Sequence, residues 1–153
     1  MSEPANDALR LDSQLCFKLY AASRAVIRGY KPMLDQLGLT YPQYLVMLVL
    51  WEWQAEPVDA PTVKALGERL ALDSGTLTPL LKRLEVLGWV SRRRSMADER
   101  EVHLGLTDAG LALREQVGPL TARLLCERAV DLQSLDTLRQ GLDRLLDQIR
   151  ASV

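Results

Sequence analysis

The sequence predicts a mainly α-helical protein with one small β-hairpin wing, the combination of a winged helix-turn-helix fold. Two short helical segments joined by a tight turn lie between Thr62 and Leu87, and a β-like, arginine-rich segment follows them. Apolar stripes at helical spacing occur near both termini, where they indicate helices that pack against a partner. We expect the 153 residues to form a single domain, with a winged helix-turn-helix over about 62–106 and dimerisation helices over about 12–37 and 108–151.

The composition is that of a chain with one hydrophobic core, since 48% of the residues are hydrophobic and 25% are charged. The segment Met1–Asp12 lacks the apolar stretch of a secretory signal, and no apolar run reaches the roughly eighteen residues of a membrane span. Two cysteines are too few for a disulfide-stapled secreted fold. We therefore expect a cytoplasmic protein without a membrane partner.

Positive charge is concentrated in one segment, although the net charge of the chain is −1. The segment Lys82–Arg100 carries +3 and the rest of the chain −4. A local positive field is what phosphate binding requires, and acidity elsewhere limits nonspecific adhesion. On charge alone, a solvated charged face is the alternative.

The first helix is predicted to begin with Asp12 as its N-cap and to reach at least Arg28, because apolar residues recur every three or four positions. They are Leu11, Leu15, Leu19, Ala22 and Val26. Gly29 and Pro32 should disturb this helix before Gly38 closes it.

Three further helices follow in the prediction. Thr40 and Pro42 precede an apolar, largely buried helix over Gln43–Trp53, and two prolines indicate a loop over Gln54–Pro61. The helix-turn-helix then comprises a helix over Thr62–Ala71 and a second over about Gly75–Leu87, capped by Asp73 or Ser74.

After Gly88 the pattern predicts a hairpin with a charged tip. Trp89, Val90 and Ser91 lead into three arginines, a polar turn spans Ser95–Glu101, and a second strand covers Val102–Leu106.

From Asp108 the pattern is helical to the end, with an interruption at Gly118 and Pro119 and a new cap near Ser134. The last helix has apolar residues spaced by three and four, a seam that requires a partner helix. They are Leu135, Leu138, Leu142, Leu145 and Ile149. Internal burial could satisfy this seam, but two amphipathic ends outside the helix-turn-helix favour a homodimer.

The predicted recognition helix carries small hydroxyl residues at its start, which suits a helix that enters the major groove with its N-terminus. Its candidate DNA-binding residues are Ser74, Thr76, Thr78, Lys82 and Arg83. The wing adds Arg92, Arg93, Arg94 and Arg100, which bracket a loop that could reach a neighbouring minor groove, and Asp98 is placed to orient Arg100. The alternative for the helix alone is an ordinary capped surface helix.

Five residues in and after the wing form the motif D-x-R-x5-L-T-x2-G. They are Asp98, Arg100, Leu106, Thr107 and Gly110, and the motif resembles the signature of the MarR family of winged-helix regulators. The resemblance implies that Asp98 and Arg100 shape the wing, that Arg100 contacts double-stranded, pseudo-palindromic operator DNA, and that the first and last helices interlock into a dimer.

Cys16 lies about one turn into the first helix, with Tyr20 one turn further on the same face. Tyr30 and Tyr41 lie near the ends of adjacent elements, so the three tyrosines could converge on the sulfur, where phenol hydroxyls can donate to a thiolate. The alternative is that Cys16 is a small buried hydrophobic residue.

Three segments, Leu11–Tyr20, Leu39–Glu52 and Leu72–Glu85, resemble the OhrR branch of the MarR family, whose members sense organic hydroperoxides. The likeness runs from about Leu11 to Gly110. It implies a repressor in which Cys16 is the peroxidatic thiol, hydrogen-bonded by tyrosines at the positions of Tyr30 and Tyr41. In some members a cysteine from the C-terminal region of the other subunit resolves the oxidised thiol, a role that falls here on Cys126; otherwise a small thiol would cap Cys16.

Two alternatives stay open at this point. One is a MarR-type regulator controlled by a small-molecule ligand, with Cys16 unreactive; the other is a thiol peroxidase, although we expect no enzyme because supporting catalytic groups are absent. Cys16, Cys126 and His103 share no metal-ligand spacing, so we expect no metal and no cofactor.

Overall fold

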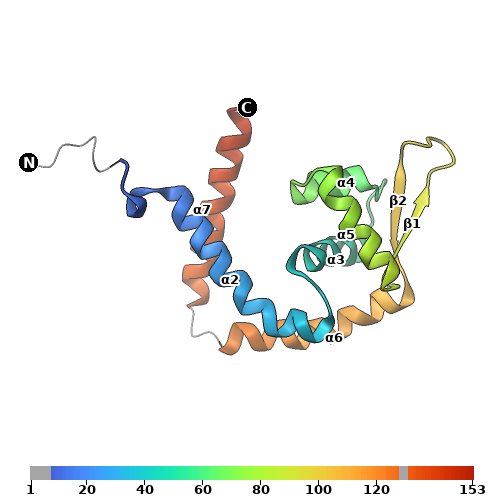
Figure 1. Ribbon diagram of the computed structural model, residues 1–153, viewed down its shortest axis with the longest axis horizontal. Coiled ribbons are helices and arrows are strands. Elements are labelled where there is room, and N and C mark those ends of the chain that lie inside the picture. The colour runs from blue at the N-terminus through green and yellow to red at the C-terminus, as the bar shows by residue number, and fades with distance from the viewer. Residues whose placement is uncertain (1–7, 128–130) are drawn as a thin grey trace, which may run out of the picture. The chain divides into compact units, whose positions relative to one another are not determined.

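The computed structural model describes residues 8–127 and 131–153, with side chains through residue 124 and again from residue 131 (Figure 1). Within them the elements are η1 (Leu11–Ser13), α2 (Leu15–Leu37), α3 (Tyr41–Ala55), α4 (Val63–Leu70), α5 (Ser74–Val86), β1 (Val90–Arg94), β2 (Val102–Leu106), α6 (Asp108–Glu127) and α7 (Leu132–Ala151). This is the mainly helical fold with a hairpin wing that the sequence predicts. None of the described helices combines the length and apolar character that a membrane crossing requires.

The chain divides into two compact units, Met1–Gly118 and Pro119–Val153. The first unit contains α2 to α5, the hairpin and the start of α6, and it holds the hydrophobic core. The assignment of a single domain and of dimerisation helices to both ends stays a prediction.

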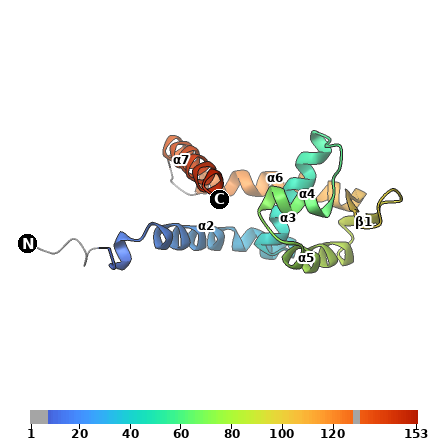
Figure 2. The same cartoon turned by 90° about the horizontal axis from the view of Figure 1, so that it is seen from above.

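Helix α2 runs unbroken through Gly29 and Pro32, so the predicted disturbance is wrong (Figures 1 and 2). Arg28 and Pro32 are both exposed, and water can therefore satisfy the carbonyl group that loses its partner at the proline. The predicted cap at Asp12 is also wrong: this residue lies in η1 and forms an ion pair with Lys18 at 3.6 Å, while Gln14 occupies the cap position. Gly38 ends α2 in the left-handed region at φ 70°, as predicted.

Helix α3 forms the centre of the core in the first unit. Thr40 caps it through a reciprocal pair of hydrogen bonds with Gln43, so the helix begins at Tyr41, two residues before the predicted start at Gln43. Val46 and Met47 are fully buried, and α3 contacts α2, α4, α5 and β2. The elements around α3 are thereby held to one central helix.

The helix-turn-helix is formed by α4 and α5, which Thr62 and Asp73 cap through their side chains. Ala71 closes α4 in the left-handed region at φ 54°, and this conformation makes the tight turn between the helices. A Cβ on Gly67 would lie 2.7 Å from the carbonyl oxygen of Leu72, so the close approach of the turn to α4 requires glycine.

The wing is an antiparallel pair in which Val90 lies opposite Leu106 and Arg94 opposite Val102. It is anchored to the helix-turn-helix by the backbone: Leu104 N–H donates to the Pro61 carbonyl at 2.7 Å. Strand β1 also contacts α5, so the hairpin lies beside the recognition helix (Figure 1).

The L-T-x2-G part of the motif closes the base of the wing. The Thr107 hydroxyl donates to the Gly88 carbonyl and accepts from Gly110 N–H at 3.0 Å, so it joins the end of α5 to the start of α6. A Cβ on Gly110 would lie 2.1 Å from the carbonyl oxygen of Trp89. These residues serve the architecture of the wing, and glycine is required by sterics.

Helix α6 continues through Gly118 and Pro119, so the predicted interruption is wrong as a break in the helix, although the boundary between the two units lies at this bond. Glu115 and Pro119 are exposed, which leaves the unpaired carbonyl of Glu115 open to water. Helix α7 is capped three residues before the predicted position: Asp131 accepts hydrogen bonds from the N–H groups of Gln133 and Ser134.

Candidate nucleic-acid interface and thiol site

The start of the recognition helix α5 is exposed and rich in hydroxyl groups. Asp73 accepts the backbone N–H of Thr76 at 2.7 Å, and this hydrogen bond from Thr76 holds the pKa of the Asp73 carboxyl below its usual value. The Thr78 hydroxyl donates to the Ser74 carbonyl at 2.8 Å, so its proton is engaged within the helix. Ser74 and Thr76 are exposed, so the end of the helix that the sequence predicts to read DNA faces solvent.

The basic residues of α5 lie further along the helix. Lys82 and Arg83 are both exposed, whereas Leu77, Leu81 and Leu84 on the opposite side are buried. The helix therefore presents a polar side with hydroxyl groups at its N-terminus and cations near its end, as the sequence analysis predicts.

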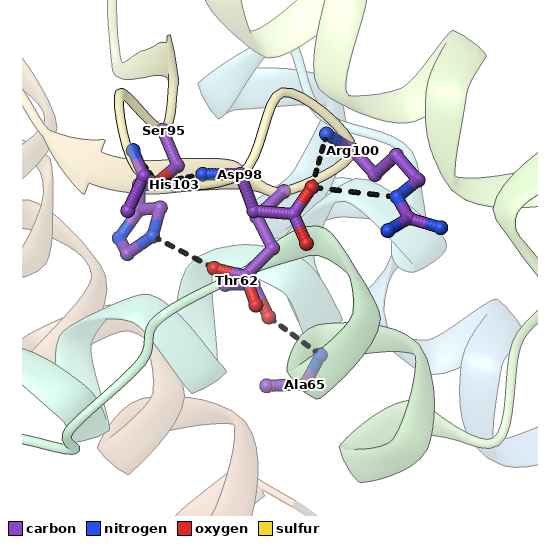
Figure 3. Close-up of polar contacts among 8 residues, drawn as sticks. Thr62, Ala65, Ser95, Asp98, Arg100 and His103 are labelled. Carbon is purple, nitrogen blue, oxygen red and sulfur yellow. Dashed lines mark hydrogen bonds and ion pairs between the residues drawn. The ribbon is translucent and has the colours of Figure 1, made fainter.

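At the wing tip Asp98 holds Arg100 (Figure 3). One carboxylate oxygen, Oδ1, accepts the backbone N–H of Arg100 at 3.0 Å and contacts its Nε at 3.4 Å. Ser95 closes the tip by accepting the N–H groups of Ala97 and Asp98. The Arg100 side chain is 92% exposed, so Asp98 orients it through its backbone N–H and Nε while most of the guanidinium faces solvent.

The three consecutive arginines differ in their surroundings. Arg93 and Arg94 are exposed. Arg92 is half-buried, and its Nε lies 2.7 Å from Oε2 of Glu85, near the end of α5. The sequence pattern assigns no role to Glu85, because nothing in it shows that the strand returns to this part of the helix.

A groove of about 760 Å³ lies between α4, α5 and the wing. Ser74 and Thr78 line it from the recognition helix, and Arg92, Asp98 and Arg100 line it from the wing. The recognition helix and the charged wing thus border one continuous concave surface.

Cys16 is the second residue of α2 and is exposed, so its reading as a buried hydrophobic residue does not hold within this chain. The next turn carries Tyr20, whose hydroxyl accepts a 2.7 Å hydrogen bond from Arg24. Leu15 and Leu19 beside Cys16 are also exposed. An exposed thiol among exposed apolar side chains is accessible to a small oxidant.

The tyrosines at the other end of α2 form a cluster of their own. The ring of Tyr30 lies 5.6 Å from that of Tyr41 and 6.0 Å from that of Tyr44, which is 4% exposed. Burial raises the pKa of Tyr41, and the neighbouring Tyr30 and Tyr44 raise it further. Tyr44 was missed by sequence reasoning, although its place one turn after Tyr41 on a capped helix was a usable signal.

Within one protomer the structure does not bring Cys16 to this cluster. Cys16 and Tyr30 lie fourteen residues apart on the unbroken α2, which separates them by about 21 Å along the helix axis. Cys126 lies in the last turn of α6, and its side chain is outside the described residues.

In the wing, Nε2 of His103 in β2 lies 3.6 Å from Oε2 of Glu101 in the turn before that strand. Across the described ranges 8–127 and 131–153, no three histidine, cysteine or acidic residues gather as a metal site would require.

An exposed recognition helix, a charged wing and the groove between them define a winged-helix DNA-binding protein. A family model described as "Transcriptional regulator SarA/Rot" matches residues 28–117, more than half of the chain. The chain belongs to this group of MarR-family transcriptional regulators and is of the OhrR type.

Two curated relatives match most of the chain. The organic hydroperoxide resistance transcriptional regulator of Bacillus subtilis (strain 168) is 45% identical over 143 residues, 94% of each chain. The HTH-type transcriptional regulator TtmR of Methylorubrum extorquens (strain PA1) is 49% identical over 144 residues, 90% of this chain and 71% of TtmR. These relatives are regulators and not enzymes, which removes the thiol peroxidase alternative.

Among solved structures, AbfR of Staphylococcus epidermidis is 35% identical, with a TM-score of 0.76 over 97% of this chain and 99% of AbfR. AbfR has also been solved in its reduced form bound to DNA, with a TM-score of 0.71, and in its overoxidised form bound to DNA, with a TM-score of 0.68. A further structure shows AbfR with a disulfide formed, with a TM-score of 0.58.

Proposed function

We propose that this DNA-binding regulator is a cytoplasmic, homodimeric repressor that leaves its pseudo-palindromic operator when an organic hydroperoxide oxidises Cys16. The observation that carries the proposal is the exposed Cys16 at the start of α2, in a chain whose relatives include an organic hydroperoxide resistance regulator. The releasing event is a disulfide between Cys16 and Cys126 of the partner subunit.

The proposed chemistry has two steps. The Cys16 thiolate attacks the terminal hydroxyl oxygen of the hydroperoxide, the O–O bond breaks, and an alkoxide leaves and is protonated to the alcohol; the sulfur is thereby oxidised to a sulfenic acid. The thiolate of the resolving Cys126 then attacks this sulfur, an S–S bond forms, and the S–O bond breaks to release hydroxide, which becomes water on protonation.

The geometry of α2 supports a sensor built from two subunits. Because Tyr30 lies about 21 Å along the same helix, the phenols of Tyr30 and Tyr41 can meet Cys16 only across a dimer in which the two α2 helices run in opposite directions. The exposed apolar residues Leu15, Leu19 and Val26 on α2 supply a surface for this contact.

Helix α7 supports the dimer independently. Leu138, Leu146 and Ile149 are between 46% and 57% exposed, and α7 has no buried residues. An apolar stripe of this kind is stabilised by a second copy of the same helical surface.

The AbfR structures support the disulfide, rather than oxidation of the thiol as such, as the releasing event. That protein has been solved on DNA in both its reduced and its overoxidised forms, and a separate structure describes the disulfide state. By this reasoning, an extra negative charge at Cys16 leaves the DNA-binding form intact, whereas a new bond between subunits displaces helices and changes the spacing of the recognition helices.

The test uses a duplex selected from a random-sequence pool by the reduced wild-type protein, with cumene hydroperoxide as oxidant and no small thiol present. Wild type should bind, release the duplex on oxidation, and form a cross-linked dimer on nonreducing electrophoresis. Cys16→Ser and Cys126→Ser should bind and stay bound, and Cys16→Asp should bind as a mimic of overoxidation.

Release of the duplex by oxidised Cys16→Ser would overturn the sensing role of Cys16. Release by oxidised Cys126→Ser would overturn only the resolving step. Titration of free thiols in the same samples separates thiol oxidation from control by a small-molecule ligand, because a ligand leaves both thiols free.

A further inference from the structure

An ion pair connects the recognition helix to the wing. Glu85 in the last turn of α5 and Arg92 in the middle of β1 meet at 2.7 Å. The side chains are 40% and 28% exposed respectively, whereas the Arg100 side chain in the wing-tip pair is 92% exposed. The Glu85–Arg92 pair is therefore partly shielded from solvent and salt, which makes it stronger than an ordinary surface pair.

Helix stability does not explain the presence of Glu85. A carboxylate in the last turn of a helix faces the negative end of the helix dipole, which is unfavourable. Contact with the Arg92 guanidinium offsets this cost. The carboxylate is thus held at a place where its partner on the wing, and not its own helix, stabilises it.

Strand geometry directs Arg92 to this partner. Side chains alternate between the faces of a strand, so Arg92 shares the face of the buried Val90 and points toward α5, while Arg93 points to the opposite face. Arg92 lies opposite the buried Leu104 in the hairpin. The pair therefore spans the junction between α5 and the sheet.

This junction determines how the two DNA-reading elements are arranged. A recognition helix reads base edges in the major groove, and a wing reaches the neighbouring minor groove, so their mutual orientation decides whether both fit at once. The ion pair also withholds one cation from the phosphates, whose contacts add affinity without sequence information.

We infer that Glu85 is a specificity-determining positioning residue: by binding Arg92 it holds the wing against the recognition helix and keeps Arg92 from binding phosphate nonspecifically. The inference rests on DNA binding by the winged helix, and it is independent of the thiol switch. Loss of the Glu85 charge should therefore weaken the preference for specific DNA and strengthen binding to any DNA.

The experiment compares the reduced wild type with Glu85→Gln, a substitution that keeps the shape and removes the charge. Affinities are measured by fluorescence anisotropy for the duplex selected by wild type and for a scrambled duplex of the same composition, across a range of salt concentrations. Glu85→Gln should bind the scrambled duplex more tightly and lower the ratio of specific to nonspecific affinity about tenfold. Its affinity should also depend more steeply on salt, by about one additional released counterion, because Arg92 can then contact a phosphate.

Two controls separate positioning from general charge. Glu99→Gln removes the same charge from the exposed wing tip, so it should raise both affinities equally and leave their ratio unchanged. The double variant Glu85→Arg, Arg92→Glu restores the ion pair with the charges reversed, and it should recover most of the ratio of specific to nonspecific affinity. Thermal unfolding of each variant verifies that it is folded.

An unchanged ratio in Glu85→Gln would overturn the inference, as would an equal fall of the ratio in Glu99→Gln. A Glu85→Gln protein that loses affinity for both duplexes together with a lower Tm would also overturn it, because Glu85 would then be merely structural. All measurements use reduced protein, so failure here leaves the oxidation experiment unaffected.

Discussion

The indole Nε1 of Trp51 donates a 2.9 Å hydrogen bond to the carbonyl oxygen of Gly110, 59 residues further along the chain. This bond joins the central helix α3 to the first turn of α6. The same turn is tied through Thr107 to Gly88, at the end of the recognition helix. The base of the wing, the recognition helix and the core are therefore stabilised as one structure.

Gly110→Ala should lower the free energy of unfolding by about 3 kcal/mol, since the added methyl group would lie 2.1 Å from the Trp89 carbonyl oxygen and the backbone would have to shift. Urea unfolding followed by circular dichroism measures the change. Gly118→Ala is the matched control: its Cβ meets nothing within 4 Å, and alanine should stabilise the helix by about 0.5–1 kcal/mol. Equal unfolding midpoints for the two variants would contradict the steric role of Gly110.

Trp51→Phe should cost about 1–3 kcal/mol, because it removes a buried hydrogen bond to the carbonyl of Gly110. The half-buried Trp53 on the same helix offers the comparison, and Trp53→Phe should cost less. Guanidinium unfolding at several protein concentrations gives both values. If Trp53→Phe proved the more destabilising of the two, the hydrogen bond would not be the reason for Trp51.

Asp73→Ala should lower the Tm at neutral pH, with a difference from wild type that shrinks in acid. The hydrogen bond from Thr76 lowers the pKa of Asp73 in the folded protein, so its stabilisation is present above the ordinary carboxyl pKa of about 4 and is lost as pH falls through the lower folded value. Differential scanning calorimetry between about pH 2 and 7 measures this. A Tm difference that stays constant over this range would show that the charge of the cap is irrelevant.

Tyr41→Phe should slow the oxidation of Cys16 about tenfold, the expected cost of losing one hydrogen bond to a charged sulfur. The raised pKa of Tyr41 keeps its phenol protonated, and so able to donate, throughout the neutral range. Loss of free thiol on addition of cumene hydroperoxide gives the rate. Tyr20→Phe is the comparison variant one turn from Cys16, where the hydroxyl accepts a hydrogen bond from Arg24; a wild-type rate in Tyr41→Phe would exclude Tyr41 from the sensor.

Tyr41 should also affect stability in alkali. Its folded pKa lies above the unfolded value, so its contribution is complete below about pH 10 and is lost as pH rises through the folded pKa. The decline in Tm above this pH should be less steep in Tyr41→Phe, and parallel declines in the two proteins would contradict the assignment.

Arg100→Ala should weaken DNA binding and reduce its salt dependence by about one ion per contact, as expected for a lost phosphate or minor-groove contact. Asp98→Ala should weaken binding less and keep the salt dependence, because the cation remains and only its orientation is lost. Anisotropy titrations across salt concentrations distinguish the two. An identical salt dependence in Arg100→Ala and wild type would remove Arg100 from the interface.

Much of this protein follows from short-range patterns. The caps at Thr40 and Asp73, the helix-turn-helix, the hairpin and the Asp98–Arg100 pair each depend on residues within a few positions of one another. Such patterns depend on periodicity and on hydrogen bonds within one turn, so they can be predicted without tertiary information.

The tertiary structure decided what depends on distance through space. The unbroken α2 separates Cys16 from Tyr30 within one protomer, Tyr44 joins the tyrosine cluster, and Glu85 meets Arg92 across an element boundary. With the same local sequence, a proline can be tolerated in an exposed helix or can break it. In the same way, a charged side chain can face solvent or a partner on another element. The packing of the elements against one another chooses between these outcomes, and for that reason the sequence alone predicted the DNA-reading elements while the structure revealed how the wing is held to them.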